Sequence, residues 1–118
     1  DVLADWLASI DKLRARVPDD VLVLPAHGDP FYGLHARLDR LAQKRHQALE
    51  RLRPWLADKP RRVVDTFEPL FGRAKFADFF TLQLATGEAM AYLNHLAARG
   101  EAFSTVDGEG TPWYRGRR

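Results

Sequence analysis

The stretch Val21–Pro30, VLVLPAHGDP, runs four apolar residues directly into a loop that contains two prolines, a glycine and a single histidine. A continuous apolar run rich in valine is typical of a strand that is buried on both faces of a sheet. In open α/β sheets, binding and catalytic groups gather at the carboxyl ends of such strands. His27 occupies that position, between the small residues Ala26 and Gly28. The stretch therefore predicts a ligand site built around His27 or, as the simpler alternative, a loop histidine that faces water.

The residues before this stretch predict a helix over 1–16. Its apolar side chains recur every three or four positions, at Leu3, Leu7, Ile10 and Leu13. Pro18 ends this helix, because proline disfavours the helical conformation in the residue before it. A helix followed by a buried strand is half of a βαβ unit, and a lone strand lacks partners for its backbone hydrogen bonds. We therefore expect residues 1–32 to be the edge of a larger α/β sheet, with Val21–Leu24 paired to another copy, docked on the rest of the chain or disordered.

Three further helices and a hairpin are predicted downstream. Periodic apolar residues indicate a long helix over 33–57, a short helix over 63–71 that Gly72 ends, and a third helix over 79–99. The predicted inward face of the third helix is Leu82, Ala85, Ala89, Leu93 and Leu96. The sequence DGEG at 107–110 is a hairpin turn signal. Three helices followed by a hairpin is the order of a winged-helix domain, so the expected fold class is mainly α, a winged helix preceded by the helix–strand remnant of an α/β fold.

Composition narrows the classes of protein to which the chain can belong. The chain has 118 residues, of which 46% are hydrophobic, and its net charge is only +2, which suits a packed core rather than a polycation. The absence of cysteine excludes a disulfide scaffold and any thiolate metal site, and it fits a cytoplasmic protein. No apolar run approaches the roughly 20 residues that span a bilayer, so no membrane partner is expected.

Cationic and imidazole side chains follow the histidine loop. His35, Arg37, Arg45 and His46 are candidates to line a substrate cleft, and a solvated helix face is the simpler interpretation of the same residues. Between positions 36 and 62, nine Lys or Arg stand against three acidic residues. Such a surface attracts anionic ligands, although local ion pairs on a helix surface explain the same composition.

The predicted third helix is poorly suited to reading DNA. Residues 81–99 contain one basic side chain, Arg99, and one acidic side chain, Glu88. A DNA-recognition helix needs cationic side chains that contact phosphates and polar side chains that contact base edges. We expect Glu88 to make a structural contact to an arginine, and Trp113 and Tyr114 to anchor the hairpin on the helices. A free-standing winged-helix module that binds nucleic acid or another protein remains the alternative function.

Two segments of the chain resemble the metallo-β-lactamase superfamily of hydrolases. VLVLPAHGDP is similar to the family's last metal-ligand motif, and Gly87–Leu96, GEAMAYLNHL, is similar to the signature of the winged-helix domain that follows the hydrolase fold in one branch. The resemblance implies that His27 is the final ligand of a two-metal zinc site. The family's main motif, His-x-His-x-Asp-His, is absent from the sequence. We therefore expect a fragment that is inactive alone, and we assign it no catalytic residue.

The same resemblance implies how the chain is organised and what it contacts. Residues 1–32 would be the carboxyl-terminal edge of the hydrolase fold, and residues 33–118 a winged-helix accessory domain that shapes the active-site cleft and selects the substrate. The expected partners are the remainder of a parent hydrolase, a small-molecule or anionic substrate, and a second copy in a homodimer. An ester or thioester is the first expectation for the substrate, and an RNA phosphodiester is the next.

Overall fold

The computed structural model describes residues 1–117. Its elements, in order, are α1 (Val2–Arg16), α2 (Leu34–Asp58), the 3-10 helix η1 (Val63–Thr66), α3 (Phe67–Phe71), α4 (Phe79–Ala98), β1 (Ala102–Val106) and β2 (Pro112–Gly116). The protein is therefore mainly helical with a two-stranded antiparallel sheet, and its helices and hairpin follow one another in the order that the sequence predicts. Among the described residues, no helix combines the length and apolar character needed to cross a membrane.

Local sequence explains where the helices begin and end. Two of them start at an aspartate whose carboxylate accepts a backbone N–H of the first turn, Asp1 from Ala4 at 3.0 Å and Asp78 from Thr81 at 2.7 Å. Gly72 ends α3 with a φ of 73°, a left-handed conformation that glycine adopts without steric cost. The predicted stop at this glycine is confirmed.

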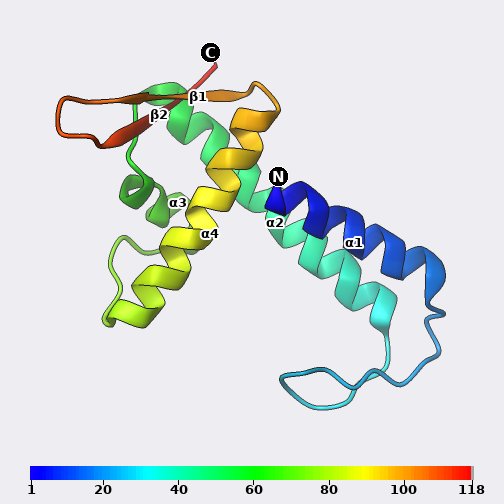
Figure 1. The fold of residues 1–118 in the computed structure, drawn as a ribbon. Helices are drawn as coiled ribbons and strands as arrows, with labels where there is room; N and C mark the ends of the chain where they lie inside the picture. Colours follow the sequence, from blue (N-terminus) through cyan, green and yellow to red (C-terminus); the bar gives the residue numbers. More distant parts are fainter. Residues whose placement is uncertain (118) are drawn as a thin grey trace.

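The core lies where α2, α4, the short helices and the hairpin meet. Leu52, Ala89 and Leu93 have no exposed surface, and Leu3 of α1 joins the same cluster with 6% exposed. Figure 1 shows α1 lying along the first half of α2, with α4 crossing beside them. The predicted inward face of α4 is confirmed, with Leu82 partly buried at its edge. Because Leu3 packs with residues of α2 and α4, the first helix and the following helices share one core.

The hairpin is tied to the segment that follows α2. Arg61 and Tyr114 exchange two backbone hydrogen bonds of 2.8 and 2.7 Å, which adds a single bridge beside β2. Tyr114 is buried, as expected of an anchor. Trp113 instead donates its indole N–H to Asp107 at 2.8 Å and lies under the guanidinium of Arg62, so it is held within the hairpin and by the η1 cap.

The predicted strand over Val21–Leu24 is not formed in this chain. Only Val23 makes a bridge, exchanging backbone hydrogen bonds of 2.8 and 3.0 Å with Phe31. Leu22 and Leu24 are 51% and 74% exposed, which corrects the expectation that this segment is buried on both faces. The physical reason is that a strand needs neighbours, and the described residues offer none at this position except Phe31.

Candidate functional site

His27 lies in the long loop between α1 and α2, which extends away from the helices in Figure 1. Its side chain is exposed, and Gly28 follows it with a φ of 95°. Within residues 1–117, no group of three or more His, Asp or Glu side chains is close enough to hold a metal ion. A metal centre needs several ligands at fixed geometry, so the residues of this chain do not by themselves fit one. His27 is placed to offer a single imidazole.

His35 and Arg37 fasten the ends of this loop. The Nε2 of His35 lies 2.7 Å from the carbonyl oxygen of Val17, and since a carbonyl only accepts, that nitrogen carries the proton. The backbone N–H of His35 donates to Asp19 at 2.8 Å. The guanidinium of Arg37 lies 4.2 Å from the centre of the Phe31 ring. Both candidates hold the base of the loop through these contacts.

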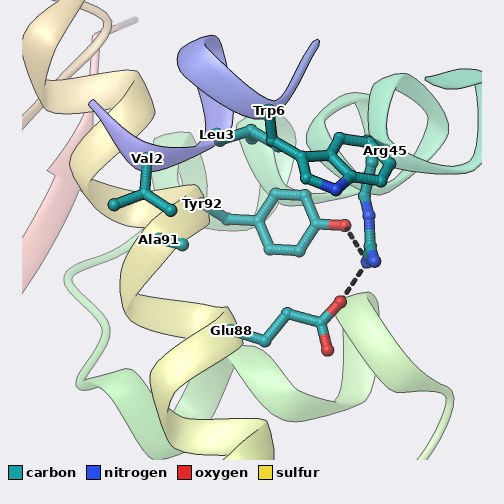
Figure 2. A pocket seen from close by; sticks show the side chains of 7 residues that line it. All are labelled: Val2, Leu3, Trp6, Arg45, Glu88, Ala91 and Tyr92. Atoms are coloured by element: carbon teal, nitrogen blue, oxygen red, sulfur yellow. Dashed lines mark hydrogen bonds and ion pairs between the residues drawn. The ribbon is translucent and has the colours of Figure 1, made fainter. Parts of the chain in front are cut away.

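Arg45 lies at the edge of a cavity of about 150 Å³ between α1, α2 and α4 (Figure 2). Its guanidinium donates to the carboxylate of Glu88 and, at 3.0 Å, to the hydroxyl of Tyr92. The ring of Trp6 packs against the same guanidinium at 5.1 Å. The remaining wall is apolar and is made by Val2, Leu3 and Ala91. Arg45 of α2 therefore contacts side chains of both other helices, Trp6 of α1 and Glu88 and Tyr92 of α4.

The charges around Arg45 are mutually satisfied. Burial alone would lower the pKa of Arg45, but the hydrogen bond to Tyr92 and the nearby carboxylate of Glu88 outweigh it, and the pKa is raised. Burial raises the pKa of Tyr92, with Arg45 opposing part of that effect. Arg45 is thus a cation, Tyr92 a neutral phenol, and Glu88 an acceptor in an ion pair. This arrangement joins helices, and it offers no unpaired acid or base for catalysis.

The expected contact of Glu88 to an arginine is confirmed. The sequence did not indicate that this arginine is Arg45, or that Tyr92 and Trp6 also contact it. The periodic pattern of α2 contains Arg45 as the one charged residue on its apolar stripe. That interruption was the signal for a partly buried cation that needs a partner. Tyr92 follows Glu88 by four positions, which places both on one face of α4. Nothing local in the sequence indicates that Trp6 completes the set.

His46 lies on α2 beside a different hollow. Its side chain is exposed and borders a space of about 340 Å³ together with Arg53, His95 and Arg99. His95 is buried, and its Nδ1 lies 2.9 Å from a carboxylate oxygen of Asp1. Burial lowers the pKa of His95, and the nearby Arg99 lowers it further, which favours a neutral ring that donates to Asp1.

The predicted site residues are therefore distributed over three places. His27 lies in the loop, and His35 and Arg37 lie at the base of that loop. Arg45 and His46 are neighbours in sequence but border separate hollows. Successive residues of a helix point in directions about 100° apart, so residues that are adjacent in the sequence of a helix need not face the same cleft.

Comparison with known proteins places this architecture in a family. A family model described as "Metallo-beta-lactamase-like, C-terminal domain" matches residues 49–117, a range that leaves out the His27 loop. No functionally curated protein matches the chain.

Two solved structures match almost the whole chain. A beta-lactamase domain protein from Burkholderia ambifaria is 32% identical with a TM-score of 0.89, and the match covers 98% of this chain and 33% of that one. A metallo-beta-lactamase family protein from Thermus thermophilus is 24% identical with a TM-score of 0.75 and the same coverage, which shows likeness of fold. This chain spans a third of the length of either protein. By the family match over more than half of its residues, the chain belongs to the metallo-beta-lactamase-like C-terminal domain family.

Proposed function

We propose that this chain is the carboxyl-terminal part of a metal-dependent hydrolase of the metallo-β-lactamase superfamily. The observation that carries the proposal is the loop around His27, where Leu22 and Leu24 expose apolar side chains beside a single imidazole. Exposed apolar residues next to unpaired backbone groups are what a severed sheet edge would present. The likeness to solved proteins three times as long supports the same conclusion.

In such a parent, His27 would supply one ligand to a zinc-type two-metal centre. One imidazole does not hold a catalytic zinc, so the other ligands would come from the rest of the parent. Such a centre, when loaded, would lower the pKa of a bound water and so activate it for hydrolysis of an ester, thioester or phosphodiester. The residues of this chain position the imidazole, since Pro25, Pro30 and the bridge between Val23 and Phe31 restrict the loop. The chain alone is expected to be inactive.

We assign residues 1–32 to the edge of the hydrolase fold and residues 33–118 to an accessory domain of winged-helix type. The order of α2, the η1–α3 pair, α4 and the β1–β2 hairpin supports this assignment. The accessory domain would border the active-site cleft, because α2 begins only seven residues after His27. Its role there would be to limit the size and charge of the substrate.

The test uses the full-length protein that contains this chain. We expect His27→Ala to lower the bound metal per protein molecule, measured by elemental analysis, and to lower hydrolysis of a chromogenic ester or thioester. His46→Ala is the matched control for metal content, because it removes an exposed imidazole that lies outside the loop. Metal content that is unchanged by His27→Ala would contradict the proposal. A full-length sequence that holds no other metal-ligand motif outside this chain would contradict it as well.

The alternative of a free-standing module that reads DNA receives little support from α4. The charged side chains of this helix are limited to Glu88, which is paired to Arg45, and to the buried His95 if it is protonated. Its exposed face instead carries uncharged residues such as Gln83, Met90 and Asn94. A gel-shift assay with duplex DNA at two salt concentrations separates the two functions, and binding that prefers one sequence would favour the module.

A further inference from the structure

Three arginines surround one glutamate at the end of the molecule opposite the His27 loop. Glu101 lies just before β1 and accepts from the Nε of Arg53 on α2 at 2.8 Å. It also accepts from the Nε of Arg99, at the end of α4, at 2.9 Å. Arg117 follows β2 and donates its backbone N–H to the carbonyl of Glu101 at 3.1 Å. We name the set of Arg53, Arg99, Glu101 and Arg117 the arginine cluster.

The carboxylate of Glu101 orients two guanidinium groups by their inner nitrogens. Each of its oxygens is engaged by a different arginine, and the hydrogen bonds from Arg53 and Arg99 lower the pKa of Glu101, which keeps it ionised. Within residues 1–117, the terminal nitrogens of Arg53 and Arg99 have no hydrogen-bond partner. These two side chains are 43% and 56% exposed, so the terminal nitrogens remain accessible to a ligand.

The cluster borders a hollow of about 320 Å³ with an apolar floor. The floor is made by Leu56 and Leu96, and all three arginines and Glu101 stand around it. Three cations against one anion leave an excess of two positive charges around the hollow. A dianion with several oxygens matches both the charge and the number of free guanidinium donors better than a carboxylate, which has one charge and two oxygens.

We propose that the arginine cluster binds a phosphate group, held by the terminal nitrogens of Arg53 and Arg99, with Arg117 adding charge. The site is separate from the loop, because Arg53 lies roughly 30 Å along α2 from its first residue. It does not rest on the hydrolase proposal. Two sources share this chemistry, a small phosphorylated molecule bound in the hollow and the backbone of a nucleic acid that passes over it.

The experiment titrates the full chain with pyrophosphate and, separately, with a short single-stranded oligonucleotide, using calorimetry at low salt. Arg53→Gln and Arg99→Gln should each weaken binding by about tenfold, since each removes charge-assisted hydrogen bonds. Arg99→Lys should recover only part of that loss, because lysine keeps the charge but lacks the fork. Arg40→Gln is the matched control, since Arg40 is an exposed α2 residue outside the cluster and carries the same change of charge.

The two probes distinguish the sources. Tight pyrophosphate binding with a weak salt dependence identifies a small ligand, whereas oligonucleotide binding that falls steeply with salt identifies a nucleic-acid backbone. Either result supports the site if the cluster variants weaken it. The proposal is overturned if neither probe binds, or if Arg40→Gln weakens binding as much as Arg53→Gln does.

The arginine variants are expected to remain folded, so a loss of binding would not be caused by unfolding. Exposed ion pairs contribute little to stability, so the variants should keep the helical circular dichroism of the parent chain. Arg117→Gln provides a second check, because the structure fixes Arg117 through its backbone and its side chain is exposed. It should weaken phosphate binding by about threefold through charge alone.

Discussion

The packing of α1 on the common core can be measured by replacing Leu3 with alanine. Leu3 is 6% exposed and lies in the cluster that contains residues of α2 and α4. The substitution removes three carbon atoms, which at about 0.8 kcal/mol each corresponds to a loss of about 2.5 kcal/mol from the free energy of unfolding. Incomplete collapse of the space raises the expected loss to about 3 kcal/mol.

Leu13 offers a matched control on the same helix. It is 48% exposed, so Leu13→Ala makes the same chemical change where about half of the side chain already contacts water. Its expected loss is about 1 kcal/mol or less.

Urea unfolding followed by far-ultraviolet circular dichroism measures both variants. With a denaturant slope near 2 kcal/mol per molar, the midpoint should fall by about 1.5 M for Leu3→Ala and by no more than about 0.5 M for Leu13→Ala. Equal small shifts would refute the reasoning, because they would mean that α1 does not rest on the core through Leu3. An early, separate loss of part of the helicity would identify α1 as its own unfolding unit.

Three further predictions concern the ion pair of Glu88 with Arg45, two glycines and the titration of Asp65. Glu88→Gln should cost about 1 kcal/mol because its pair with Arg45 is only partly exposed, and the cost should largely disappear in an Arg45→Met background when urea midpoints are compared in a double-mutant cycle. Gly72→Ala should lower the thermal midpoint, because alanine at a φ of 73° costs about 1 kcal/mol of stability. Gly87→Ala should raise the midpoint, because Gly87 lies inside α4 with open space around it and alanine stabilises a helix by about 1 kcal/mol relative to glycine. Shifts of the opposite signs would contradict the described backbone. The hydrogen bond from Arg62 lowers the pKa of Asp65. The ionised carboxylate therefore stabilises the fold above its unfolded pKa of about 3.9, and this contribution is lost as the pH falls through the lower folded pKa. The urea midpoint should consequently fall less steeply below about pH 4 in Asp65→Asn than in the unaltered chain.

The sequence predicted the helices and the hairpin because their signals are local. The periodicity of α1 and α4 lies within the helices that it predicts, and the capping aspartate that the structure shows before each of them is an equally local feature. Gly72 and the turn residues at 107–110 work in the same way, since each imposes a conformation on its own part of the backbone. Such features require no knowledge of the rest of the fold.

The strand and the site could not be predicted in the same way because they depend on distant residues. Val21–Leu24 has the composition of a buried strand, but a strand forms only where neighbours accept its hydrogen bonds, and here only Phe31 does. Arg45 stood out as a charge on an apolar stripe, yet its partners on α4 lie more than forty positions away. Local patterns indicate that a side chain needs a partner, and only the fold determines which one.

The GEAMAYLNHL motif on α4 has a mechanical meaning that its sequence does not reveal. Glu88 and Tyr92 hold Arg45 of α2, and His95 contacts Asp1 at the start of α1. The motif therefore fixes both earlier helices at once, from three successive turns of one helix face.

The same fixation extends toward the loop. α1 ends at Arg16, and the next residue, Val17, is held through its carbonyl by His35 on the first turn of α2. The motif on α4 thus positions α1, and α1 and α2 together position the base of the segment that carries His27. These contacts link α4, through α1 and α2, to the two ends of the loop that carries His27.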